Sequence, residues 1–182
     1  MKGKLKTVWL TVTCLGIALP FFTMGNGIKE QEAIEKLRFP KDYKESMLHI
    51  GSWFIPSGET AGFHNVYIDR NSFKTLKNTG VVPDGAKILK ELVSNSKGDY
   101  TTGKGISYTN GAIKKYFLMV KDSKEEYSSF SPNWGSGWGW AEYMPNNLEV
   151  NTSTNYRFDC IGCHIPATEN DYLYKEAYSV FK

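Results

Sequence analysis

Two cysteines and a histidine near the end of the chain form the run Cys160-Ile161-Gly162-Cys163-His164, which has the spacing C-x-x-C-H. Thiols at this spacing can add to the two vinyl groups of one porphyrin, and the histidine that follows can bind the iron from the same short loop. We therefore predict one haem c, attached covalently through Cys160 and Cys163, with His164 as the axial iron ligand.

A structural zinc site and a redox disulfide are the alternatives for the same cysteines. Zinc would need a fourth ligand, and the one remaining cysteine, Cys14, lies in a segment that we expect to be removed. A redox C-x-x-C pair does not require His164, and it usually opens a helix after a strand in a thioredoxin-like unit, which this sequence does not show. Haem attachment is the better interpretation.

The N-terminal residues have the pattern of a secretory signal peptide. Three lysines among the first six residues precede an apolar stretch at 8–22, and small residues follow around Gly25. The apolar stretch contains Pro20 and is shorter than the roughly 20 residues that a membrane span needs. We expect residues 1–25 to be a signal peptide cleaved near Gly25, with no stable membrane anchor. Haem is attached to C-x-x-C-H outside the cytoplasm, so both features predict the periplasm.

The charge of the remaining chain argues against a nucleic-acid partner. Residues 1–25 hold three of the 22 basic residues and no acidic ones, so residues 26–182 carry 19 of each sign. A nucleic-acid-binding protein would need a basic patch or stripe.

The remaining length is enough for one domain with a sizeable core, and we expect a single haem domain at residues 26–182.

Most of the chain before the haem motif favours β-structure. Period-two alternation of apolar residues indicates a strand at 63–69, and further strands are expected at 49–54, 86–93, 116–120 and 134–140. Short helices are expected at 31–37, 71–78 and 171–181. Only 18 residues follow His164, so the haem must be enclosed by structure built earlier in the chain. The prediction is a mainly β fold, an antiparallel sheet that encloses the haem, with a few short helices.

Several segments match one known family in their order and spacing. They are Phe39-Pro40-x-x-Tyr43, His49 to Trp53, Phe63 to Asp69, Gly80 to Ala86 followed by Lys90-Glu91, Met119 to Asp122, Trp138-Gly139-Trp140, and Cys160 to His164 followed by Asp171-Tyr172. These segments span nearly the whole chain after the signal peptide. In the order and spacing of these segments, the sequence resembles the cytochrome P-460 and cytochrome c′-beta family of periplasmic haem proteins.

The resemblance implies a mostly antiparallel β fold, usually a homodimer, in which His164 is the only protein ligand to iron and the distal position is open. Family members with a lysine bonded to the porphyrin edge oxidise hydroxylamine, whereas members without this bond bind nitric oxide or carbon monoxide. The family's lysine lies five residues past the glycine of a P-D-G-like turn, and that position here is Lys90. Lys87 is the second choice.

The position of Lys90 on its expected strand gives a physical reason to suspect the bond. Lys90 shares a strand face with Ile88 and Leu92, whereas Lys87 points to the opposite face. A lysine between apolar neighbours would point into a core, where an isolated ammonium is costly unless it is neutralised or bonded. The alternative is a solvated lysine on an edge strand, which discourages strand pairing.

Three functions remain open at this stage. The first is a hydroxylamine-oxidising oxidoreductase that acts on hydroxylamine or nitric oxide and passes electrons to a soluble cytochrome. The second is a binding protein that traps nitric oxide or carbon monoxide without turnover. The third is an electron carrier whose iron has a sixth protein ligand, for which the candidates are His49, His64, Met47, Met119 and Met144. For the histidines we favour ordinary hydrogen bonding, and for Met119 we favour core packing.

Proton acceptors and pocket walls are harder to assign from spacing. The candidate acceptors are Glu91, Asp122, Asp159 and Glu169. The loop at 152–156, where the family can place a helpful carboxylate, contains no acid, which argues against efficient hydroxylamine turnover. Candidates for an apolar distal wall are Phe54, Phe63, Phe117, Phe130 and Phe158, although core packing would explain each of them equally well.

Overall fold

A computed structural model describes residues 21–100 and 102–181 of the chain. Most of the expected signal peptide lies outside these ranges, and helix α1 (Phe21–Lys36) includes the expected cleavage position near Gly25. The signal peptide and its cleavage therefore remain predictions. Within the described ranges, no helix is both long enough and apolar enough to cross a membrane.

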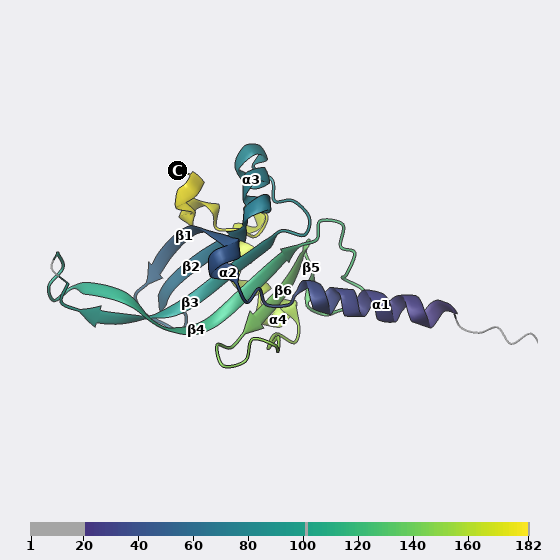
Figure 1. The fold of residues 1–182 in the computed structure, drawn as a ribbon, viewed down its shortest axis with the longest axis horizontal. Helices are drawn as coiled ribbons and strands as arrows, with labels where there is room; N and C mark the ends of the chain where they lie inside the picture. Colours follow the sequence, from purple (N-terminus) through teal and green to yellow (C-terminus); the bar gives the residue numbers. More distant parts are fainter. Residues whose placement is uncertain (1–20, 101, 182) are drawn as a thin grey trace, which may run out of the picture.

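Six antiparallel strands form one sheet in the order β1-β2-β3-β4-β6-β5 (Figure 1). The strands are β1 (Met47–Ile55), β2 (Gly62–Asp69), β3 (Lys87–Gly98), β4 (Ser107–Lys121), β5 (Trp134–Gly135) and β6 (Trp138–Tyr143). The far ends of β3 and β4 continue beyond their neighbours as a two-stranded ribbon (Figure 1). The predicted mainly β, antiparallel fold is confirmed.

The helices are few and short. After α1 come α2 (Tyr43–Ser46), α3 (Arg70–Thr79) and α4 (Tyr156–Asp159), and the C-terminal part contains the 3-10 turns η1 (Ile161–Cys163), η2 (Ile165–Asn170), η3 (Lys175–Ala177) and η4 (Ser179–Phe181). Helix α3 begins where the Asp69 carboxylate accepts a hydrogen bond from the Ser72 amide at 2.9 Å, and it ends at Gly80, whose φ of 73° is left-handed.

Three local expectations differ from the structure. The segment at 134–140 is two short strands joined at Ser136-Gly137, because both residues have a positive φ and turn the chain back. The segment at 171–181 is two 3-10 turns rather than one helix. The N-terminal helix is longer than the expected 31–37.

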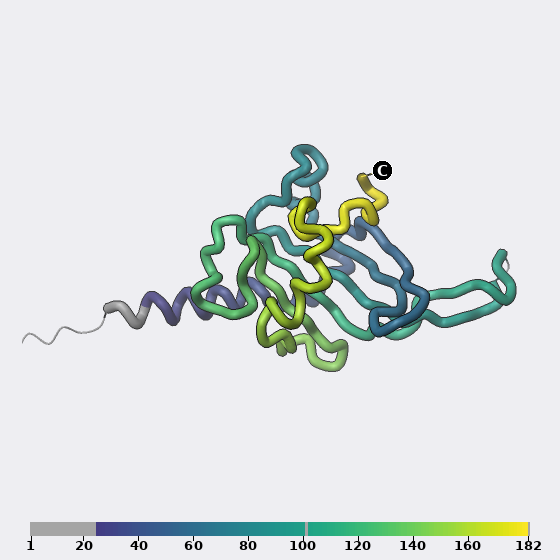
Figure 2. The backbone as a smooth tube through the Cα atoms, turned by 180° about the vertical axis from the view of Figure 1, so that it is seen from behind, coloured from purple at the N-terminus to yellow at the C-terminus, as the bar shows by residue number. Residues whose placement is uncertain are grey.

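The sheet has a separate apolar core on each face. Leu89 and Leu118 belong to the core under α1 and α2, whereas Ile88 and Met119 belong to the core on the other face. Figure 2 shows the C-terminal segment, coloured yellow, running across this second face. Because neighbouring residues of a strand point to opposite faces, β3 contributes side chains to both cores.

The C-terminal segment crosses strand β1 in close contact at Gly51. A Cβ atom at Gly51 would lie 2.5 Å from the carbonyl oxygen of Ala177 and 2.8 Å from Cα of Tyr178. Both contacts are with backbone, which cannot rotate away. Tyr178 is also buried, so the absence of a side chain at residue 51 lets the segment pack on the sheet.

We expect Gly51→Ala to lower the free energy of unfolding by about 1–3 kcal/mol, because the added methyl group forces backbone apart in a packed region. Chemical denaturation of the haem-loaded protein measures this change. Gly27→Ala is the matched control, since a Cβ atom there has no neighbour within 4 Å. Equal stability of the two variants would show that the C-terminal segment does not pack tightly against β1.

Candidate haem site

A cavity of about 370 Å³ lies on the sheet face that the C-terminal segment covers. Strands β1 to β4 and the loop before β2 line one side with Trp53, Ile55, Thr60, His64, Val66, Ile88, Lys90 and Met119. The C-terminal part lines the other side with Cys163, His164, Tyr172, Leu173, Tyr174, Glu176, Ala177 and Tyr178. The cavity therefore joins the haem motif, which comes late in the chain, to strands formed much earlier.

The imidazole of His164 is held in the state that binds a metal. Its Nδ1 lies 2.8 Å from the carbonyl oxygen of Tyr172. A carbonyl can only accept a hydrogen bond, so Nδ1 carries the proton and Nε2 keeps a free lone pair. The Trp140 ring packs edge-on against the imidazole, with 5.1 Å between ring centroids. Burial lowers the pKa of His164 to about 4, so the ring is neutral at pH 7.

The two cysteines are free thiols: Cys160 joins α4 to η1, and Cys163 is the last residue of η1. Cys163 lines the cavity, whereas Cys160 lies 3.5 Å (Sγ to Oγ) from Ser153. Burial raises the pKa of the Cys160 thiol to about 11.

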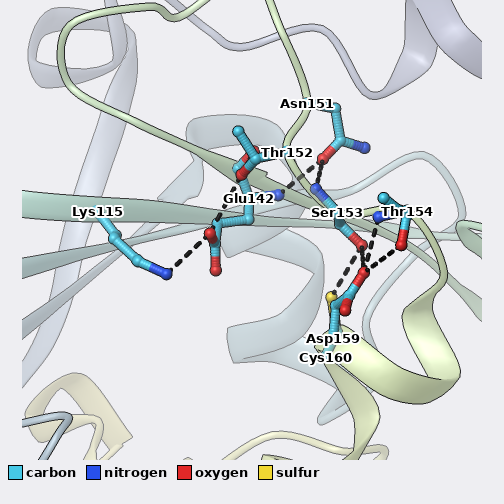
Figure 3. Close-up of polar contacts among 8 residues, drawn as sticks. All are labelled: Lys115, Glu142, Asn151, Thr152, Ser153, Thr154, Asp159 and Cys160. Atoms are coloured by element: carbon cyan, nitrogen blue, oxygen red, sulfur yellow. Dashed lines mark hydrogen bonds and ion pairs between the residues drawn. The ribbon is translucent and has the colours of Figure 1, made fainter.

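The loop that precedes the motif is ordered by its own polar side chains (Figure 3). The Asp159 carboxylate accepts hydrogen bonds from the amides of Thr154 at 2.7 Å and Asn155 at 3.0 Å, and these bonds lower its pKa. Asn151 accepts from the amide of Ser153 at 2.9 Å and from the amide of Glu142 at 3.0 Å. The loop is thereby fixed to β6, which holds Cys160 beside the sheet.

Lys90 extends from β3 into the cavity wall. Its Nζ lies 4.3 Å from the centroid of the Phe117 ring, and it forms no ion pair with any carboxylate of the described ranges. Burial lowers the pKa of the Lys90 amine, and the neighbouring Cys163 and Cys160 thiols and Glu142 only partly oppose this shift. Lys90 is thus half-buried, with its amine in the cavity wall near both haem cysteines.

These residues fit a haem group. Two free thiols, a neutral imidazole with a free Nε2 and a cavity with mostly apolar walls meet at one place. Within the described ranges, no cluster of three or more histidine, cysteine, aspartate or glutamate side chains could hold a metal ion.

Lys87, the second choice for the haem bond, lies on the other face of the sheet. Its pKa is lowered by burial, and the charges that act on it come from Glu35, Lys36 and Asp69 rather than from the cysteines. Residues 87 and 90 differ by an odd number of positions on one strand, so their side chains point to opposite faces. Of the two lysines, only Lys90 faces the cavity.

Glu91 lies on the same face as Lys87 and forms the centre of a buried polar cluster. It is 2 % exposed, and its Oε1 accepts from the Tyr43 hydroxyl and from Lys44 Nζ at 3.1 Å. Its Oε2 accepts from Asn65 Nδ2 and from the Tyr67 hydroxyl, both at 3.2 Å. Burial, together with the charge of Glu91, raises the pKa of Tyr43 and raises that of Tyr67 to about 12. This cluster holds β3 from the face opposite the cavity.

The four acidic residues proposed as proton acceptors do not line the cavity. Glu91 faces the other side of the sheet, Asp159 binds loop amides, and Asp122 accepts from the amides of Glu126 and Tyr127 at 3.0 and 3.2 Å. Glu169 is exposed in η2.

Two other carboxylates, which were not among the candidate proton acceptors, lie at or beside the cavity. Glu176 is the only carboxylate among the lining residues of the described chain, and it is exposed at the rim. Glu142 pairs across the strands with Phe117, which pairs in turn with Lys90, so all three share one sheet face. Its Oε1 binds Lys115 at 2.9 Å and Thr152 Oγ1 at 3.1 Å (Figure 3). Period-two counting along β6 was the signal that could have found Glu142.

The aromatic wall also differs from expectation. None of the five phenylalanines named as candidates is among the lining residues, although Phe117 contacts the Lys90 amine. Trp53, Tyr172, Tyr174 and Tyr178 form the aromatic wall instead.

Of the candidate sixth ligands, His64 and Met119 line the cavity. His64 donates from Nε2 to the Thr60 carbonyl at 2.8 Å and stacks on Trp53, with 5.0 Å between ring centroids. Its Nδ1 is buried without a partner in the described ranges, and burial lowers the pKa of His64.

His49, another candidate sixth ligand, is exposed. Its Nε2 is hydrogen-bonded to the Ser52 hydroxyl at 2.8 Å, and its ring lies beside Tyr67. His49 therefore lies on the face of the Glu91 cluster, away from the cavity.

The sequence profile of the family described as Cytochrome P460 matches residues 40–175, a range that includes the six strands, the haem motif and most of the residues that line the cavity. Because this match covers most of the chain, the protein belongs to the cytochrome P460 family. It is therefore a c-type cytochrome that binds haem. A comparison with curated proteins gives no match.

The raised pKa of Tyr67 predicts a loss of stability in alkali. The folded protein holds the phenolic proton to about pH 12, whereas an unfolded chain releases it near pH 10, so the stabilisation is complete below pH 10 and is lost between pH 10 and 12. We expect the free energy of unfolding of Tyr67→Phe to fall less over this interval than that of the parent protein. At pH 7 the variant should be less stable by about 1 kcal/mol, the usual contribution of one hydrogen bond.

Urea unfolding at a series of pH values measures both effects. Tyr108→Phe is the control, because Tyr108 is exposed and has no bond to Glu91. If Tyr67→Phe lost stability between pH 10 and 12 as steeply as the parent protein, the titration of Tyr67 would not be the cause.

Proposed function

We propose that this protein is an exported, periplasmic mono-haem cytochrome that oxidises hydroxylamine at an open iron site and passes the electrons to a soluble cytochrome. In this proposal, Cys160 and Cys163 form the two thioether bonds, His164 is the only protein ligand to iron, and Lys90 is bonded to the edge of the porphyrin. The observation that carries the proposal is the half-buried Lys90 side chain, whose amine faces the cavity near both cysteines and has no counter-ion within the described ranges.

The environment of Lys90 supports a covalent role. An isolated buried ammonium is costly, and the lowered pKa favours the neutral amine, which has a free lone pair and is nucleophilic. A bond between this nitrogen and a porphyrin carbon replaces one N–H and one C–H bond and releases two protons and two electrons. A two-electron oxidant such as a peroxide can accept the electrons.

The haem, when bound, supplies the iron that binds the nitrogenous molecule and accepts its electrons. The protein supplies the remaining parts of the site. Tyr172 orients His164 through its carbonyl oxygen, and the aromatic wall limits access of water. Glu176, exposed at the rim, can take protons from the cavity to solvent. We also propose a homodimer, which the resemblance implies.

Binding of nitric oxide or carbon monoxide without turnover is the second candidate function. The scarcity of acids in the described cavity wall favours it, because hydroxylamine oxidation releases protons and Glu176 is the only lining carboxylate there.

The ultraviolet-visible spectrum after reduction with dithionite tests the proposal. We expect a strongly red-shifted Soret band in the parent protein, which indicates a lysine-modified porphyrin, and a normal high-spin c-type band in Lys90→Met. Lys87→Met is the matched control, because it removes a lysine from the opposite face of the same strand. It should keep the red-shifted band and the hydroxylamine oxidation, whereas Lys90→Met should lose both.

Other spectra would contradict the proposal in distinct ways. A normal high-spin band in the parent protein would favour the gas-binding function. Sharp low-spin α and β bands would mean a sixth ligand and an electron carrier, and Met119 or His64 would then be the residues to replace. If the red shift were lost in Lys87→Met instead of Lys90→Met, the bond would be assigned to Lys87, and the proposed role of Lys90 would be wrong.

A further inference from the structure

The turn that follows η2 holds two consecutive non-glycine residues in left-handed backbone conformations. Asp171 has a φ of 59° and Tyr172 has a φ of 62°. Each such conformation raises the free energy of the folded state by on the order of 1–3 kcal/mol, so it is kept only where surrounding contacts hold it in place. The contacts of this turn should therefore reveal what enforces it.

The side chain of Asp171 is bound to the sheet by two donors. Its Oδ1 accepts from Lys121 Nζ at 2.8 Å and from Trp138 Nε1 at 3.2 Å. Lys121 and Trp138 are directly paired residues on β4 and β6, and the ammonium lies 4.6 Å from the centroid of the indole ring. Lys121 is only 9 % exposed and Asp171 is 35 % exposed, so the ammonium side of this ion pair is shielded from water while the carboxylate is partly solvated. We call these three residues the Asp171 clamp.

The clamp lies next to the group that orients the predicted iron ligand. The carbonyl oxygen of Tyr172, the residue after Asp171, accepts the Nδ1 proton of His164 at 2.8 Å. On the other side of Tyr172, Leu173 is 1 % exposed in the core. The amide of Tyr172 is itself bonded to the Ala167 carbonyl at 2.9 Å. The Tyr172 carbonyl is thus fixed between a side-chain anchor and a core anchor.

We propose that Lys121, Asp171 and Trp138 are positioning residues for the iron ligand. By holding the turn in its left-handed conformation, the clamp keeps the Tyr172 carbonyl in line with Nδ1 and maintains a strong hydrogen bond to His164. A strong bond of this kind makes the imidazole a better electron donor to iron, which strengthens the iron–histidine bond and lowers the reduction potential. This inference rests on the haem and His164 parts of the proposed function, and it is independent of the substrate and of Lys90.

Three substitutions separate the clamp from the backbone strain. Lys121→Met removes the ammonium from the sheet side. Asp171→Gly removes the carboxylate but suits the left-handed conformation, so loss of function in this variant cannot come from backbone strain. Asp171→Asn keeps an oxygen that accepts from both donors and tolerates the same backbone, so it is the conservative variant. Lys29→Met is the control, because its ion pair with Glu32 at 3.2 Å is exposed and lies on α1.

The readouts are the iron–histidine stretching frequency of the reduced haem-loaded protein, from resonance Raman spectra, and the reduction potential. We expect Lys121→Met and Asp171→Gly to shift the stretch to lower frequency and the potential upward, while Asp171→Asn and Lys29→Met match the parent protein. Parent-like values of both readouts in Lys121→Met and Asp171→Gly would overturn the inference, even if these variants unfolded more easily.

Failure of the proposed function gives a different result. A parent protein that binds gases without oxidising hydroxylamine would still show the clamp effect on both readouts. A sixth protein ligand would remove the stretching band, but the potential would still rise in Lys121→Met and Asp171→Gly if the inference is correct. A parent protein whose iron is not bound by His164 would overturn the inference outright.

Discussion

The alternation of side chains along β3 is the constraint on which the site depends. Lys90 faces the cavity and the haem cysteines, while Glu91, the next residue, is buried among Tyr43, Asn65 and Tyr67 on the other face. A register shift of one residue would place the carboxylate in the cavity and the lysine under the helices. The Glu91 cluster and the pairing of β3 with β2 and β4 together prevent that shift. An amine can therefore remain in a largely apolar cavity.

The second constraint is closure of the cavity by the end of the chain. The haem motif comes after all six strands, so the C-terminal segment must cross the sheet and pack on it (Figure 2). Gly51 lets the segment approach β1, the Asp171 clamp ties it to β4 and β6, and Leu173 fills the core between these points. The segment carries the iron ligand, so the contacts that close the cavity also orient His164.

Much of the fold and of the haem site could be predicted from the sequence, because the patterns that indicate them are local. C-x-x-C-H depends on spacing within five residues, and period-two alternation places Lys90 and Lys87 on opposite faces without knowledge of the fold. The helix expected at 71–78 likewise lies within α3, which ends at Gly80. Contacts between distant segments could not be predicted this way. Nothing local in the sequence shows that Asp171 binds Lys121, 50 residues earlier, or that Glu176 lies at the cavity while Asp159 binds loop amides.

The bond between Lys90 and the porphyrin is tested most directly by proteolysis of the purified haem-loaded protein followed by tandem mass spectrometry of the haem-bearing fragment. We expect one fragment in which the peptide with Cys160 and Cys163 is joined through a single porphyrin to the peptide that contains Lys90, with fragmentation assigning the bond to that residue. Recovery of the Lys90 peptide free of haem, or a bond assigned to Lys87, would contradict it.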